Sequence, residues 1–170
     1  MKEHIAYFTI GTGCANAEEV YDLFRKTQEE LAKNPEIYVL VLAGEGLSEA
    51  GDILSEEQMR IIREGMEQLR IPVIAASESP VQEDYLGCDI VIVSENAMEE
   101  AKKMAEQIAK NAPVAVQQIK RCVNVGNRFG QDAGKAYELQ AFSLCHSTED
   151  KIIGMNALRN NESEKHFVNR

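Results

Sequence analysis

The side chains that most often carry chemistry, those of cysteine and histidine, form no reactive cluster in this sequence. The four cysteines are widely spaced and form no Cys-x-x-Cys pair: Cys14, Cys88, Cys122 and Cys145. This spacing argues against a metal centre or a disulfide framework, and it favours buried, reduced thiols because free cysteine behaves as a small hydrophobe. His4 and His146 have no partner nearby in the sequence, and both are interpreted as structural.

Two polar segments that follow apolar runs are better placed for chemistry. The first is Gly44–Ile53, which contains three glycines, and the second is Ser77–Gly87, which contains three carboxylates. Glycine lets backbone N–H groups approach a ligand closely, and a positioned carboxylate can transfer a proton. The same segments can also be turns that merely end strands, with solvated charges.

The elements that would position these segments follow from the periodicity of the apolar residues. Apolar runs of strand length occur at residues 5–10, 37–42, 72–76 and 88–93. Asn16 and Ser55 each precede a stretch of helical spacing and have Glu19 and Gln58 three residues on, which is typical of a capping box. From Asn96 to the end the pattern is helical, and Pro113 and Thr148 are suited to helix starts.

This order of elements predicts one α/β domain with helices covering a largely parallel sheet. A chain of 170 residues with 44% hydrophobic content is long enough for a single core. We expect residues 1–97 to form the α/β core and residues 98–170 a helical region of the same domain. The pattern equally allows a small doubly wound, flavodoxin-like domain.

Charge and hydropathy exclude several classes of function. The formal net charge is −10 and no cluster of Lys and Arg interrupts it, which argues against nucleic acid as a partner. The first residues lack the apolar core of a signal peptide, and no run of ~18 apolar residues occurs. We therefore expect a cytoplasmic protein that does not enter a membrane.

Several segments, taken together, carry a resemblance to a known family. They occur in this order: residues 5–46, Pro72–Ala76, Cys88–Ala97, Asn111–Val116, Glu138–Phe142 and Ser147–Asp150. Each alone would fit any α/β protein. In this order, and covering nearly the whole chain, they resemble the signatures of the enoyl-CoA hydratase/isomerase (crotonase) family, in a shortened form.

The resemblance implies a fold and a function. The implied fold is α/β, a truncated crotonase-like (ClpP/crotonase) ββα spiral core with a helical C-terminal region. The implied function is to act on or bind an acyl-CoA thioester, as in fatty acid metabolism, with a lyase or isomerase activity. Coenzyme A would enter as part of the substrate or ligand, and no separate cofactor or metal is implied.

The family's shared chemistry is stabilisation of an enolate at the thioester carbonyl by two backbone N–H groups. The resemblance implies Ala50, Gly51 or Asp52 as the source of the first donor, in a segment that is shorter here than in the family. The second donor belongs to a glycine-rich loop, of which this chain keeps only Gly87. Which residue of the first segment would present its N–H stays open.

The segment that replaces the glycine-rich loop is acidic. Glu78, Glu83 and Asp84 would oppose a developing oxyanion, because like charges repel. Hydratases of the family also use two glutamates to move protons. Glu83 or Asp84 takes the position of the first, or is a solvated loop charge, while the second has no counterpart after Asn96.

These losses predict impaired classical hydratase activity. The alternative is a catalytically inactive crotonase-like protein that serves in binding or assembly. Lys165, Phe167 and Arg170 resemble the family's tail that packs near the CoA of a neighbouring subunit, although such a cluster also suits a frayed helix end. The expected partners are acyl-CoA and further copies of the chain, as a trimer or a hexamer built of trimers.

Overall fold

The computed structural model describes residues 4–11, 16–81, 85–162 and 165–170. Its internal contacts divide the chain into two compact units, Met1–Glu106 and Gln107–Arg170. The first unit holds a parallel sheet with helices on its two faces, and the second unit is helical.

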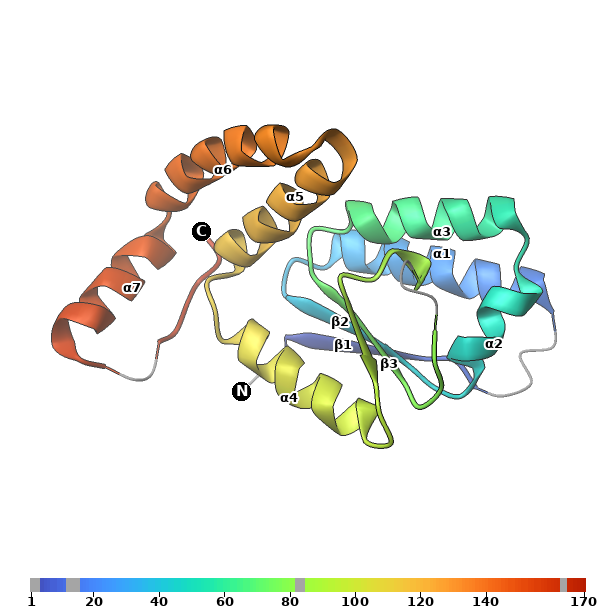
Figure 1. Cartoon of the computed structure of the whole chain (residues 1–170). Helices are drawn as coiled ribbons and strands as arrows, with labels where there is room; N and C mark the ends of the chain where they lie inside the picture. The colour runs from blue at the N-terminus through green and yellow to red at the C-terminus, as the bar shows by residue number, and fades with distance from the viewer. Residues whose placement is uncertain (1–3, 12–15, 82–84, 163–164) are drawn as a thin grey trace. The chain divides into compact units, whose positions relative to one another are not determined.

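The sheet of the first unit has four parallel strands in the order β1-β2-β3-β4 (Figure 1). They are β1 (Ile5–Thr9), β2 (Val39–Ala43), β3 (Val73–Ser77) and β4 (Ile90–Val93). Every residue of β2 and β3 is buried, which explains why these strands are continuous apolar runs. A doubly wound domain reverses its strand order at a switch point, whereas this sheet grows in one direction only.

Three α-helices and a 3₁₀ turn connect the strands, and a fourth helix follows the last strand. They are α1 (Ala17–Lys33), α2 (Gly46–Ile53), α3 (Glu56–Gln68), η1 (Tyr85–Gly87) and α4 (Ala97–Ala109). The side chain of Asn16 accepts a hydrogen bond from the N–H of Glu19 at 2.9 Å, and Ser55 with Gln58 forms a complete capping box. Both caps match the sequence prediction.

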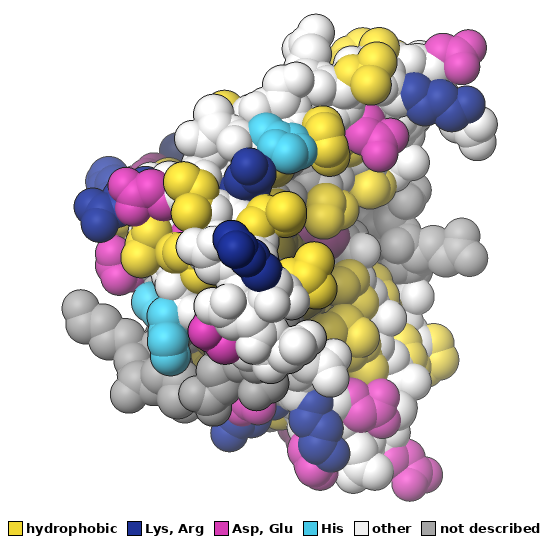
Figure 2. Space-filling model, turned by 90° about the vertical axis from the view of Figure 1, so that its left-hand side faces the viewer, with side chains coloured by type: hydrophobic (Ala, Val, Ile, Leu, Met, Phe, Trp, Pro, Cys, Tyr) yellow, Lys and Arg dark blue, Asp and Glu magenta, His cyan; other side chains and the backbone are white. Residues whose placement is uncertain are grey.

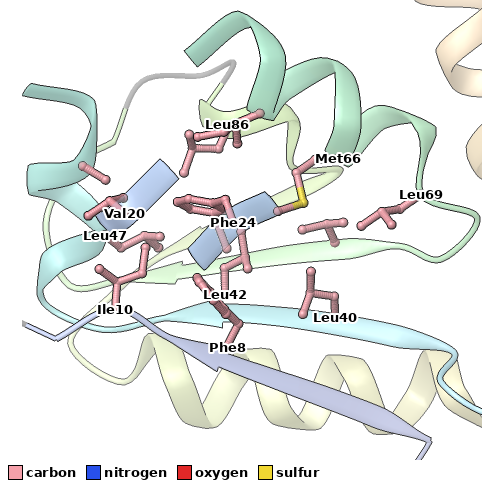
Figure 3. Close-up of a cluster of buried hydrophobic side chains, with 14 of the residues drawn as sticks. Phe8, Ile10, Val20, Phe24, Leu40, Leu42, Leu47, Met66, Leu69 and Leu86 are labelled. Carbon is pink, nitrogen blue, oxygen red and sulfur yellow. The ribbon is translucent and has the colours of Figure 1, made fainter. Parts of the chain in front are cut away.

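The main core lies between the sheet and the helices α1, α2 and α3 (Figure 3). The rings of Phe8 on β1 and Phe24 on α1 are 5.2 Å apart, and Met66 and Leu86 close the core from α3 and η1. Burying each such side chain stabilises the fold by about 1.5–3 kcal/mol. On the other face of the sheet lies α4, whose buried residues are alanines at every fourth position (Figure 1): Ala97, Ala101 and Ala105.

Asp89 fixes the start of β4 beside the start of β3. Its side chain accepts a hydrogen bond from the N–H of Val73 at 2.8 Å, and its own N–H donates to the carbonyl of Val73 at 2.9 Å. The aspartate of the Cys88–Ala97 signature therefore has a structural role here.

The second unit contains α5 (Pro113–Phe129), α6 (Gln131–His146) and α7 (Glu149–Asn160). Gly130, with φ +93°, joins α5 to α6 in a tight antiparallel hairpin. The two helices approach closely at glycines, since a Cβ added to Gly134 would lie 3.0 Å from the Cα of Gly126. Pro113 occupies the first turn of α5, and Thr148 caps α7 by accepting from the N–H of Lys151 at 3.2 Å.

The α/β fold with a helical C-terminal region is confirmed, and one local expectation changes. The glycine-containing segment Gly44–Ile53 is not merely a turn that ends β2, because most of it forms the helix α2. Leu47, Ala50 and Leu54 are spaced by three and four residues, and all three are buried in the main core. This short apolar stripe outweighs the glycines that suggested a loop.

We predict that Gly44→Ala destabilises the first unit. Gly44 has φ +116°, and a Cβ at this position would lie 2.1 Å from the carbonyl oxygen of Ile10. Strained backbone and a clash with backbone together should lower the free energy of unfolding by about 1–3 kcal/mol or more, as measured by urea denaturation. Gly11→Ala is the control, because a Cβ there meets nothing within 4 Å. Equal stability of the two variants would contradict this account.

Candidate functional site

The first expected donor segment lies in the second half of α2. Ala50, Gly51 and Asp52 are residues of this helix, and the N–H of Leu54 donates to the carbonyl of Ala50 at 3.1 Å. In an α-helix each N–H bonds to the carbonyl four residues earlier. The N–H groups of residues 50–53 are therefore directed along α2 toward the carbonyls of residues 46–49.

The start of α2 is fixed by close contact between two chain turns at the end of β1 and β2. The N–H of Gly46 donates to the carbonyl of Ile10 at 3.2 Å, and a Cβ on Gly46 would lie 2.4 Å from the carbonyl oxygen of Gly11. The two backbones touch at these positions, which requires glycine. Ala50 itself is fully buried, whereas Asp52 is exposed.

The second expected donor, Gly87, is the last residue of η1. It has φ +71°, and a Cβ there would lie 2.6 Å from the carbonyl oxygen of Arg63 on α3. Leu86, beside it, has φ 51° and is fully buried in the core. Gly87 is thus required for η1 to pack against α3. Glu83, the proposed proton-transfer residue, lies outside the described residues, as does Asp84.

The expected CoA-contacting residues of the tail lie against α7. Phe167 packs over Gly154, where a Cβ would meet its ring at 3.8 Å. Arg170 pairs with Glu149 at 3.3 Å between exposed side chains, and its carbonyl accepts from the N–H of Glu149 at 2.7 Å. Lys165 is exposed. These three residues belong to the second unit, and Ala50–Asp52 and Gly87 to the first.

Asp150 holds the tail, and sequence reasoning did not single it out for this. Its carboxylate is buried and accepts hydrogen bonds from the N–H groups of Val168 at 2.6 Å and Asn169 at 3.1 Å. The sequence signal was an acidic residue in the first turn of a capped helix, which is ordinarily exposed. Only the folded tail shows that this aspartate is a buried acceptor.

The described residues contain three free thiols and no group of three or more His, Cys, Asp or Glu side chains that could hold a metal ion. Cys88, Cys122 and Cys145 are partly buried. Burial is the main cause that raises the pKa of the Cys122 and Cys145 thiols, which keeps them protonated at neutral pH.

A groove of about 570 Å³ lies between α1 and α3, and it includes none of the expected site residues. Its apolar wall includes Leu31, Ile61 and Ile71. Arg70 lines it as well, and donates to the carbonyl of Asn34. Partial burial lowers the pKa of the Arg70 guanidinium from its usual value. Of its other charged side chains, Arg25 pairs with Glu29 across the groove wall, and Glu64 pairs with Arg60 outside it.

Comparison with known proteins gives a consistent result. No family model matches the chain. The short-chain-enoyl-CoA hydratase of Clostridium acetobutylicum is 38% identical over 80 residues, which are 47% of this chain and 31% of that protein. The 2,3-dehydroadipyl-CoA hydratase of Escherichia coli is 27% identical over 154 residues, which are 88% of this chain and 56% of that protein. The chain spans from about a third to just over half of the length of these curated relatives.

Solved structures show the same fold. An enoyl-CoA hydratase from Bacillus anthracis superposes with a TM-score of 0.72 at 18% identity, over 98% of this chain and 96% of that chain. An enoyl-CoA hydratase/isomerase from Mycobacterium paratuberculosis gives a TM-score of 0.73 at 14% identity, over 100% and 97% of the two chains.

The parallel sheet and its helices therefore define a protein of the crotonase fold. The sequence matches agree with this fold, because the curated proteins that the chain resembles are named as hydratases of CoA thioesters. Among the helices that are described, none is both long and apolar enough to cross a lipid bilayer.

We predict that Asp150→Ala releases the tail. Loss of a buried acceptor for two backbone N–H groups should lower the stability of the second unit by about 1–3 kcal/mol. Trypsin should then cleave after Lys165 faster than in the unchanged chain, as measured by mass spectrometry over time. Glu149→Gln is the control, because it removes only the exposed pair with Arg170, and exposed pairs contribute little. Unchanged cleavage of Asp150→Ala would contradict the role given to this carboxylate.

Proposed function

We propose that this chain binds an acyl-CoA thioester and hydrates an enoyl-CoA slowly, if at all, compared with an ordinary hydratase. The resemblance to the crotonase family supports the ligand, and both curated relatives are named as hydratases of CoA thioesters. The signatures of the family run in order along the chain, from the first strand to Ser147–Asp150. The shortened segments of the chain support a low rate of hydration.

One observation carries the proposal of low activity: the backbone N–H groups of Ala50–Asp52 are used by α2. An oxyanion is stabilised by N–H groups that point at the position where negative charge develops. An N–H that bonds within a helix does not point at a ligand. Loss of one such donor typically costs ~10²–10³ in rate.

The segment after β3 supports the same conclusion. The hydroxyl of Ser77 donates to the carbonyl of Ser79 at 2.8 Å, and the hydroxyl oxygen accepts from the N–H of Ser79 at 3.2 Å, which makes a closed turn. Glu78 is exposed in this turn. A carboxylate at this position raises the energy of a nearby oxyanion. The lack of a counterpart for the second glutamate would cost a further ~10²–10⁴.

A second candidate function is a catalytically inactive member of the family that serves in binding or assembly. The exposed apolar side chains of the second unit favour it. They lie on α5, α6 and α7, and those at least half exposed are Ile119, Val123, Phe129, Leu139, Phe142, Ile152, Met155 and Leu158. Figure 2 views the side on which α6 and α7 lie in Figure 1, and it shows hydrophobic side chains at the surface between charged ones.

We therefore also propose that the chain forms a homo-oligomer through this apolar surface, of the trimer type or as a hexamer built of trimers. Large exposed apolar patches mark interaction sites, and eight large apolar side chains of these three helices are at least half exposed. The most exposed of these side chains are Leu139 at 75%, Leu158 at 73% and Phe129 at 70%.

The activity prediction is tested with crotonyl-CoA. We expect the loss of its absorbance to be at least ~10²-fold slower than the turnover of 1–10³ s⁻¹ typical of enzymes. Calorimetry should still detect binding of crotonyl-CoA. Turnover at an ordinary rate would contradict the proposal of low activity, and binding without turnover would favour the second candidate. If the chain neither binds nor turns over crotonyl-CoA, the proposal that it binds an acyl-CoA thioester is contradicted.

The oligomer prediction is tested by light scattering with Leu139→Glu and Phe142→Glu combined. The unchanged chain should have a mass well above 19.0 kDa, and the double variant should shift toward the monomer, because charge at an apolar interface is costly. Lys135→Glu, on the same helix α6 and also exposed, is the matched control and should keep the mass unchanged. A monomeric unchanged chain would refute the assembly.

A further inference from the structure

Arg63 lies on the flank of α3 that faces η1. The neighbouring residues Ile62 and Met66 point into the core, and on the opposite flank Gln28 of α1 donates to the carbonyl of Ile62 at 3.1 Å. The backbone of Arg63 is in direct contact with Gly87, because a Cβ on Gly87 would lie 3.1 Å from the Cα of Arg63. Arg63 is therefore adjacent to the residue expected to provide the second backbone donor.

One donor of the Arg63 guanidinium, Nε, lacks a partner among the residues that the structure describes. This Nε atom is buried. Buried polar atoms are nearly always paired, so an unpaired donor calls for water, an ion or a ligand group to accept its hydrogen bond.

The other arginines of the first unit are engaged. Arg25 pairs with Glu29 at 3.4 Å, and Arg60 pairs with Glu57 at 2.6 Å and with Glu64 at 2.9 Å. Arg70 donates to the carbonyl of Asn34. Within the described residues of this unit, Arg63 is the arginine for which no ion pair or hydrogen bond is found.

The charge of the chain makes this arginine important for an anionic ligand. With a net charge of −10, the protein repels anions unless a local cation compensates. A guanidinium presents a planar fork of N–H donors that matches carboxylate and phosphate oxygens. An arginine whose Nε lacks a partner in the described part of the chain, and whose backbone contacts Gly87 of η1, is suited to such a group.

We propose that Arg63 is a ligand-binding residue, whose guanidinium binds an anionic oxygen of a CoA thioester beside η1. This rests on the proposed function, which it deepens by assigning a cationic contact in the first unit. The anionic oxygen belongs either to the nucleotide phosphates of CoA or to a carboxylate on the acyl group. A guanidinium binds both kinds of oxygen through the same charge-assisted hydrogen bonds, and the experiment below distinguishes them.

The test compares Arg63→Gln with the unchanged chain by calorimetry, using crotonyl-CoA, S-crotonyl-pantetheine and adipoyl-CoA as probes. Loss of a charge-assisted contact should weaken crotonyl-CoA or adipoyl-CoA binding about tenfold or more. If the phosphates bind Arg63, the difference between the two proteins disappears with the pantetheine thioester, which lacks them. If an acyl carboxylate binds it, the difference is largest with adipoyl-CoA.

Arg60→Gln is the matched control. Arg60 lies one turn earlier on α3, is exposed and is paired with two glutamates, so its loss removes the same charge without the proposed contact. Its affinity should stay within about twofold of the unchanged chain. Arg63→Lys keeps the charge and loses the fork, and an intermediate affinity is expected.

The outcomes separate this inference from the proposed function. If the unchanged chain binds the probes and Arg63→Gln binds all of them equally well, the proposed function stands and the role of Arg63 is overturned, leaving water as the partner of Nε. If the unchanged chain binds no probe, both are overturned. Should Arg63→Gln fail to fold, Arg63→Lys decides: a weaker affinity than that of the unchanged chain supports the contact, and an equal affinity overturns it.

Discussion

The close backbone contact between Gly44–Gly46 and Ile10–Gly11 determines much of the first unit. The approach requires glycine at positions 44 and 46, and the hydrogen bond from the N–H of Gly46 to the carbonyl of Ile10 fixes where α2 begins. Once α2 starts at Gly46, its helical bonds use the N–H groups of residues 50–53. A contact at the end of two strands thus determines which backbone donors remain for a ligand.

The same constraint relates the fold to the proposed function. The crotonase fold needs only a buried parallel sheet and apolar helix faces, and these remain intact here. Enolate stabilisation needs backbone N–H groups that are free of other hydrogen bonds and point at the thioester oxygen. This requirement is separate from the stability of the fold. A protein of this fold can therefore keep its core while losing rate, because the core and the rate depend on different groups.

In the second unit, backbone hydrogen bonds to α7 order the C-terminal residues 165–170. Asp150 supplies buried acceptors to Val168 and Asn169, and the first turn of α7 binds the carbonyl of Arg170 through the N–H of Glu149. Residues expected to contact CoA are thereby held along α7. The apolar side chains of α5, α6 and α7 that stay exposed set this unit apart from the fully buried central strands β2 and β3 of the first unit.

The sequence by itself determined the α/β fold class, the helix caps at Asn16, Ser55 and Thr148, and the two buried central strands. These follow from local capping chemistry and from periodicity, which are properties of neighbouring residues. It also carried the resemblance to the crotonase family, because the signatures keep their order. It did not reveal α2, since its apolar stripe is only three residues long and becomes decisive when β1 and β2 bury it.

Tertiary structure alone decided the roles of Asp150, Arg63 and Gly87. Whether a carboxylate is a solvated charge or a buried acceptor depends on backbone that is distant in sequence, as for Asp150 and the tail. Whether an arginine is paired depends on which carboxylates the fold brings within reach, and Arg60 takes two of them while Arg63 faces η1. Spacing along the chain carries no information about such contacts, because packing between separate elements creates them.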